Sequence, residues 1–154
     1  MILRLIDKFF PPEKVFAHCD IPCGIYDPYS AQIGAITVVR MTQLLKEAKG
    51  DVHKVARLTA VKEEHAELVK NEVRIIWGDY FKPEHIEKFP ETHNLVFDIM
   101  KLGSKVKQEV DEKAAAELIV KVQRFAEIFW STKGKKTKKV AAPSPSGGEM
   151  VLYE

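Results

Sequence analysis

The sequence predicts an all-α fold, an antiparallel up-down-up-down bundle of four helices, with a short irregular segment ahead of the first helix. Apolar residues recur at spacings of three and four through the middle of the chain, and the alternation typical of strands is nearly absent. The 154 residues are 45% hydrophobic, which is enough for one domain with a sizeable core. Each predicted helix is amphipathic, so all four must pack together to bury their apolar faces.

The first helix is expected to begin at Asp27-Pro28, an N-cap residue followed by proline at the first helical position, and to end near Ala48. Asp51 can cap the second helix, which extends to about Trp77. Its predicted apolar stripe consists of Leu58, Val61, His65 and Leu68, with Val69, Val73 and Ile76 beside it.

The third helix is expected to follow a connector at residues 78–89, beginning at Pro90 and closing at Gly103. The fourth helix should run from about Asp111 to Trp130. The residues that these two helices would bury are Leu95, Ile99 and Leu102 in the third, and Leu118, Val122, Phe125 and Phe129 in the fourth.

Two terminal segments fall outside the predicted domain of residues 18–132. Residues 1–17 form a leader whose apolar stretch is interrupted by charges and by Pro11-Pro12, unlike the core of a secretory signal. Residues 133–154 carry a lysine run followed by a segment rich in proline, serine and glycine, which predicts a flexible lysine-rich tail. Two interpretations of this tail stay open: a solvated extension, or a segment that binds a polyanion or a partner.

Charge and hydropathy exclude several classes of protein. The formal net charge is +2, but without the leader and the tail it is about −2, so no basic face for nucleic acid is predicted. No stretch approaches the roughly 18 apolar residues of a membrane span. The chain has 2 cysteines, too few for the disulfide framework of a small secreted domain, and a reduced, cytoplasmic protein is expected.

One segment, HCDIPCGIYDP at residues 18–28, gathers both cysteines, a histidine, two prolines and a glycine ahead of the first helix. Its prolines and glycine favour a tight hook that would bring the sulfurs of Cys19 and Cys23 toward one point. From the residues alone, four interpretations stay open: two unremarkable thiols, a local disulfide, half of a zinc site, or another metal site.

The same segment resembles the nickel hook of the nickel superoxide dismutase family, whose mature chains begin at that histidine. The similarity continues through TVVR in the first helix, WGDYFKP at residues 77–83 and IFW at residues 128–130, and covers about residues 18–132. The resemblance implies a four-helix bundle assembled as a homohexamer, with one nickel ion per subunit as cofactor. It further implies that superoxide is converted to dioxygen and hydrogen peroxide by a Ni(III)/Ni(II) cycle at the N-terminal hook.

By this resemblance, the metal ligands are the amine and imidazole of His18, the amide and sulfur of Cys19, and the sulfur of Cys23. Two thiolates and two nitrogen donors in a plane suit square-planar Ni(II) or Cu(II) better than tetrahedral zinc. While Ala17 is attached, the His18 nitrogen is an amide and a poor ligand. A maturation protease that cuts after Ala17 is therefore expected, and the uncut chain should be inactive.

The resemblance also assigns roles to residues around the ligands. Tyr26 matches a tyrosine that stands beside the open face of the metal and limits what reaches it; otherwise it is a packed aromatic residue. Pro22 matches a proline whose peptide bond shapes the hook. Asp20 is expected to anchor the loop through hydrogen bonds rather than to bind the metal.

Two positions depart from the family pattern. A glutamate and an arginine hold the axial imidazole in the family, and Gly34 and His65 stand at the matching positions here. His65 is either a core histidine or a replacement contact for the axial ring. The departures leave the ligands intact but put the axial geometry in doubt.

Two other classes of function compete with the enzyme. One is a helical module that senses nickel or oxidant without turning over superoxide, and the other is a structural bundle with an incidental cysteine pair. Metal content, the N-terminal residue and dismutase activity distinguish the three hypotheses.

Overall fold

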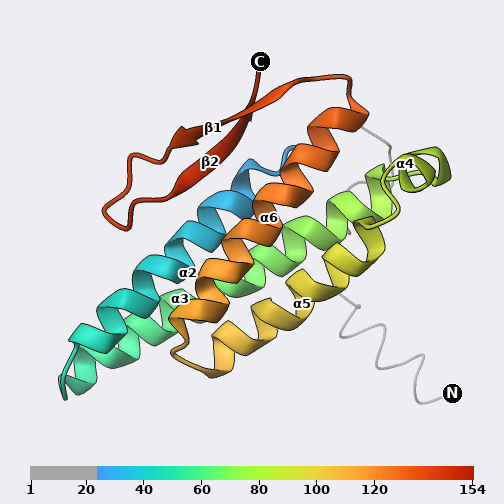
Figure 1. The fold of residues 1–154 in the computed structure, drawn as a ribbon. Coiled ribbons are helices and arrows are strands. Elements are labelled where there is room, and N and C mark those ends of the chain that lie inside the picture. Colours follow the sequence, from blue (N-terminus) through green and yellow to red (C-terminus); the bar gives the residue numbers. More distant parts are fainter. Residues whose placement is uncertain (1–23) are drawn as a thin grey trace, which may run out of the picture.

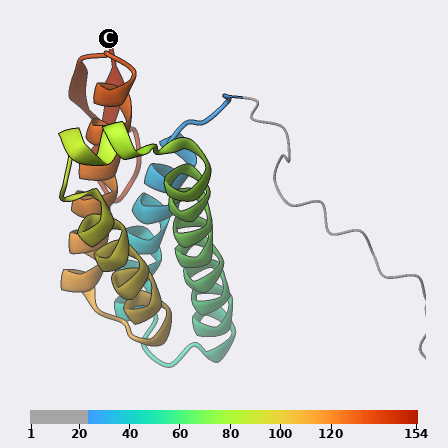
Figure 2. The ribbon, with the colours of Figure 1, turned by 90° about the vertical axis from the view of Figure 1, so that its right-hand side faces the viewer.

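Four long helices make up most of residues 24–154, the part of the chain that the computed structural model describes (Figure 1). Neighbouring helices run in opposite directions, and the last packs on the first, which confirms the predicted up-down-up-down bundle (Figure 2). Residues 18–23 of the predicted hook, which spans 18–28, lie outside the described residues. The four helices are α2 (Tyr29–Glu47), α3 (Val52–Ile75), α5 (Thr92–Gln108) and α6 (Glu112–Thr132).

The predicted helix starts are marked by aspartate side chains. Asp51 accepts a hydrogen bond from the Lys54 N–H at 2.9 Å, and Asp111 accepts one from the Ala114 N–H at 3.0 Å. Asp27 accepts one from the N–H of Tyr29, the first residue of α2, at 2.8 Å. Each bond satisfies an N–H group that has no partner inside its helix.

The core lies along the facing stripes of the four helices. In α3 the fully buried apolar residues are Ala66, Val69 and Val73, whereas the predicted stripe through Val61 and His65 is only half-buried. The buried face of α3 is therefore displaced from the predicted stripe, because α3 packs between α2 and α5. Other fully buried residues are Val38, Ile99, Val106, Leu118, Val122, Phe125, Ile128 and Phe129.

The prediction that Gly103 closes the third helix is wrong, since α5 continues to Gln108. Gly103 is buried, and a Cβ atom there would lie 2.8 Å from Cγ of Lys70 on α3. The glycine therefore allows α5 to approach α3 closely rather than ending the helix. The end of α5 is held by the buried ammonium of Lys62, which donates hydrogen bonds to three backbone carbonyls, those of Val106, Lys107 and Glu109.

The connector between α3 and α5 is partly helical. A π-helical turn, η1 (Ile76–Tyr80), continues directly from α3, and a short helix, α4 (Pro83–Lys88), follows it. Within residues 24–154, no helix combines the length and the apolar content that a membrane span requires.

The C-terminal segment is not the flexible tail that its composition predicts. Strands β1 (Thr137–Ala141) and β2 (Glu149–Tyr153) form an antiparallel hairpin, with Lys139 opposite Val151. Met150 and Val151 are buried. The hairpin lies over α2 and α6 in Figure 1.

Along the outer edge of β2, where a third strand would otherwise pair, two glutamine side chains of the bundle form hydrogen bonds with the backbone of the strand. The Gln32 amide donates to the Val151 carbonyl at 3.0 Å and accepts from the Val151 N–H at 2.7 Å. The Gln123 amide donates to the Glu149 carbonyl at 2.6 Å. Composition could not show this, because the partners of the hairpin lie on two distant helices.

Candidate metal centre

The predicted metal ligands His18, Cys19 and Cys23 lie outside the described residues, as do Asp20 and Pro22. Within residues 24–154, no group of three or more histidine, cysteine, aspartate or glutamate side chains is arranged to hold a metal ion. Tyr26 is the first predicted site residue that the structure describes, and it follows Cys23 by three positions. Three residues span at most about 11 Å of chain. The structure therefore describes the end of the bundle where α2 begins, to which Cys23 is joined by a short stretch of chain.

An aromatic cluster centred on Tyr80 lies at this end. The Tyr26 ring is 5.7 Å from the Tyr80 ring, and the Phe129 ring of α6 is 4.8 Å from it. The Phe81 ring meets Tyr80 edge-on at 5.5 Å, and the His85 ring stacks on Tyr80 at 5.3 Å. Tyr26, half-buried, thus packs against Tyr80 of η1, which in turn contacts His85 of α4 and Phe129 of α6.

The π-helical turn η1 sets the position of Tyr80. It ends where the Phe81 N–H donates to the Ile76 carbonyl at 3.3 Å, and such turns are frequent at functional sites. The Thr132 hydroxyl donates to the Phe129 carbonyl at 2.6 Å, so the Tyr80 hydroxyl is the donor in its 2.7 Å bond to Thr132. Tyr80 is therefore anchored to α6 through its hydroxyl as well as its ring.

Polar groups surround the same cluster. The Lys133 ammonium lies 4.9 Å from the centre of the Tyr80 ring and 5.2 Å from that of Phe129. The Nδ1 atom of His85 accepts from the Lys82 N–H at 3.2 Å, so a neutral His85 carries its proton on Nε2. Sequence reasoning placed Lys133 in the flexible tail and assigned neither Lys133 nor His85 to the metal site; the family-like WGDYFKP stretch was the only signal pointing to this region.

Gly34 and His65 lie together where α2 crosses α3. A Cβ atom on Gly34 would lie 2.9 Å from Cγ2 of Val69 and 3.2 Å from the His65 carbonyl oxygen, so a glutamate does not fit without a shift of the helices. The Nδ1 atom of His65 lies 2.9 Å from the Val61 carbonyl. Nδ1 therefore carries the proton, and the Nε2 lone pair of this half-buried ring is available as an acceptor.

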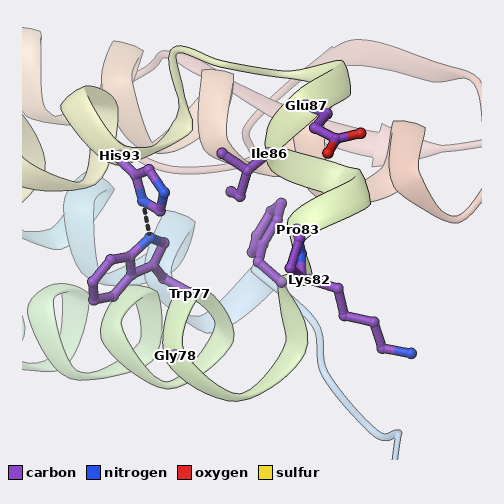
Figure 3. Close-up of a pocket in the computed structure, with 8 residues that line it drawn as sticks. Trp77, Gly78, Lys82, Pro83, Ile86, Glu87 and His93 are labelled. Carbon is purple, nitrogen blue, oxygen red and sulfur yellow. Dashed lines mark hydrogen bonds between the residues drawn. The ribbon is translucent and has the colours of Figure 1, made fainter.

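A groove that sequence reasoning did not find opens beside the aromatic cluster (Figure 3). Its volume is about 590 Å³, and Trp77, Phe81 and Ile86 supply apolar walls. The Trp77 indole N–H donates to Nδ1 of His93 at 3.0 Å across the groove. Because Phe81 contacts Tyr80 and also lines the groove, the groove and the cluster share a wall.

Comparison with known proteins decides the family. Residues 13–133 match the family described as nickel-containing superoxide dismutase. The chain belongs to the nickel superoxide dismutase family. The family prediction made from the hook and from the WGDYFKP stretch is confirmed.

Curated relatives and solved structures agree with the family match. The chain is 41% identical over 133 residues to the nickel superoxide dismutase of Streptomyces seoulensis, and 42% identical over 133 residues to that of Streptomyces coelicolor. Each match covers 86% of this chain and 98% of the relative. A native nickel superoxide dismutase structure superposes with a TM-score of 0.70 at 41% identity, covering 75% of this chain and 99% of its own. The chain is therefore an enzyme that disproportionates superoxide with nickel as its cofactor.

The hairpin lies beyond the family match, which ends at residue 133. Because the solved relative is covered almost completely, it has no counterpart of this hairpin within its own length. The β1–β2 segment is an addition to the family bundle in this chain.

Proposed function

We propose that the nickel ligands of this chain are the amine and imidazole of His18, the amide and sulfur of Cys19, and the sulfur of Cys23. The observation that carries the proposal is the HCDIPCGIYDP segment, which holds both cysteines of a chain that belongs to a nickel-dependent family. Thiolate sulfur with nitrogen donors is a ligand set that suits nickel. When bound, nickel supplies the one-electron exchange that oxidises one superoxide to dioxygen and reduces another to hydrogen peroxide.

Tyr26 acts as a wall that limits what reaches the metal. Its contact with Tyr80 supports this role, because Tyr80 is itself fixed by η1 and by its bond to Thr132. A fixed ring keeps the opening narrow enough for a diatomic anion. Backbone N–H groups of the hook and bound water deliver the two protons that hydrogen peroxide requires.

His65 would contact the imidazole of His18 in place of the glutamate and arginine of the family pattern. Its acceptor nitrogen and its half-buried position on α3 support the proposal. Asp20 anchors the loop and Pro22 shapes it. Gly34 contributes no contact to the axial ring, because it has no side chain.

Maturation, assembly and location complete the proposal. A protease cuts after Ala17, which frees the His18 amine. Six copies assemble into a homohexamer with one nickel per subunit, and exposed apolar side chains on the bundle, such as Phe97 and Val120, support association. The enzyme acts in the cytoplasm, which suits the two free thiols that the ligand set needs.

The ligands are tested with Cys19→Ser and Cys23→Ser in the chain that begins at His18. Both variants should lose at least 90% of their nickel and their dismutase activity, while Ser30→Ala, an exposed change in the first turn of α2, should lose neither. Nickel is measured by elemental analysis and activity by the decay of superoxide. A serine variant that keeps full activity would contradict the ligand set, and a wild-type chain that binds nickel without turnover would favour the sensing module.

A further inference from the structure

Residues 133–154 contain five lysines, which fall into two groups in the structure. Lys138 pairs with Glu154 at 3.2 Å, and Lys139 lies 3.8 Å from Glu127. Lys133, Lys135 and Lys136 are exposed, and none of the three has a carboxylate partner among residues 24–154. Residues 133–136 therefore carry three positive charges that form no ion pair with the carboxylates of residues 24–154.

The backbone of this stretch is held in place. The Lys135 N–H donates to the Trp130 carbonyl at 3.0 Å, and the Glu154 N–H donates to the Lys136 carbonyl at 2.9 Å. The Tyr153 ring lies 4.1 Å from the Trp130 ring at a tilt of 39°, which fixes the end of β2 on α6. The three lysines consequently occupy a defined place at the C-terminal end of α6.

That place is the end of the bundle where α2 begins, as Figure 2 shows. The Lys133 ammonium lies 4.9 Å from the Tyr80 ring, and the Tyr80 ring lies 5.7 Å from the Tyr26 ring. Lys133 is thus separated by a single aromatic ring from Tyr26, the tyrosine of the hook segment. Lys135 and Lys136 extend the positive charge outward from this point.

We propose that Lys133, Lys135 and Lys136 form a cationic entrance that draws superoxide to the hook. Superoxide is a small monoanion, and a cluster of fixed cations beside a reactive centre raises its local concentration and its rate of capture. The proposal rests on the proposed position of the hook. The entrance is a property of this chain, because Lys135, Lys136 and the hairpin that holds them lie beyond residue 133, where the family match ends.

The expected effect follows from the distances. A unit charge about 10 Å from the path of a monoanion changes its capture about twofold in water at low ionic strength. At physiological ionic strength, screening reduces this to about 1.2-fold. Carboxylates at the same end of the bundle, such as Asp27 and Asp79, oppose the attraction of superoxide by the lysines. They stay in place when the lysines are substituted.

The test measures kcat/KM for superoxide in the nickel-loaded enzyme from about 10 mM to 300 mM ionic strength, where charge screening changes most. At the lowest ionic strength, Lys133→Gln should lower kcat/KM about twofold, and the triple variant, with Lys135→Gln and Lys136→Gln added, about fourfold. The loss should disappear at high ionic strength, nickel content should be unchanged, and Lys133→Arg should retain the wild-type rate. These results would support the cationic entrance.

The matched control is Lys113→Gln, which removes the same charge at the start of α6. Its position is twenty residues before Lys133, about 30 Å along the helix, and its effect should be below about 1.2-fold at any ionic strength. A triple variant with the ionic-strength dependence of the wild type, or an equal loss from Lys113→Gln, would overturn the proposal. A wild-type chain without dismutase activity would overturn the hook assignment as well, so the two failures are distinguishable.

Discussion

Gln32 links the hairpin to the helix that carries the hook, and replacing it should destabilise the protein by an amount that depends on the hairpin. Gln32→Leu removes both hydrogen bonds to Val151, at 3.0 Å and 2.7 Å. Val151 is 1% exposed, so its N–H and carbonyl would be left buried without partners. An unsatisfied buried group costs about 1–3 kcal/mol, and the two together should cost about 2–6 kcal/mol.

The assay is urea unfolding followed by circular dichroism at one protein concentration, because assembly makes apparent stability concentration-dependent. The control is the same substitution in a chain that ends at Gly134. In that shortened chain Val151 is absent, so Gln32 has no hydrogen bonds to it, and Gln32→Leu should change stability by less than about 0.5 kcal/mol. Folding of the shortened bundle is expected, because the solved relatives lack the hairpin.

An equal loss of stability in the two chains would refute this reasoning. It would mean that Gln32 acts within the bundle and that the hairpin contributes nothing through it. A loss confined to the full chain would show that the addition and the hook-bearing helix are energetically coupled.

Three further predictions concern the bundle. Lys62→Met should lower stability by about 2–4 kcal/mol, because one buried and two part-buried carbonyls at the end of α5 lose their donor; urea unfolding measures it. Burial lowers the pKa of Lys62, so between that pKa and 10.5 the unfolded chain binds more protons, and stability should rise with pH in the wild type relative to Lys62→Met. Gly34→Ala should cost about 1–3 kcal/mol from the clash with Val69, and adding Val69→Ala should recover part of the loss. The bonds from Lys105 and from the Ala114 N–H lower the pKa of Asp111, so its stabilising effect should be lost as acid protonates it, below about pH 3.8, and Asp111→Asn should not show that loss.

Local signals in the sequence were sufficient where structure depends on neighbouring residues. Asp51 caps its helix as expected, and the fourth helix starts at Asp111 as predicted, because a capping side chain acts on the N–H groups of the turn that follows it. Gly103 was misjudged because glycine has two uses, ending a helix or allowing a neighbour to approach, and only the position of Lys70 on α3 distinguishes them.

The hairpin could not be predicted because its stability depends on distant residues. Its strands are short, and its loop is rich in the residues that also mark disorder. What orders it is the pair of amide side chains from Gln32 and Gln123 and the ring of Trp130. The two glutamine side chains form hydrogen bonds with residues 26 and 119 positions away in the sequence, and no local pattern records contacts over such separations.

The candidate site also has a local part that the sequence shows and a part, built from distant residues, that only the structure shows. The hook motif is contiguous, so the family, the cofactor and the reaction were readable from eleven residues. The surroundings of the hook are assembled from η1, α4 and α6, and only the structure shows that Tyr80, His85 and Lys133 meet there. The proposed ligands themselves, at residues 18–23, lie outside the described residues and remain a prediction.

The first residue of the active enzyme tests this account most directly. Intact mass and N-terminal sequencing of the nickel-containing protein, purified in active form, should give a chain that starts at His18. The uncut chain, supplied with the same nickel, should not disproportionate superoxide. A protein that keeps residues 1–17 and works as fast as the cut form would contradict the account.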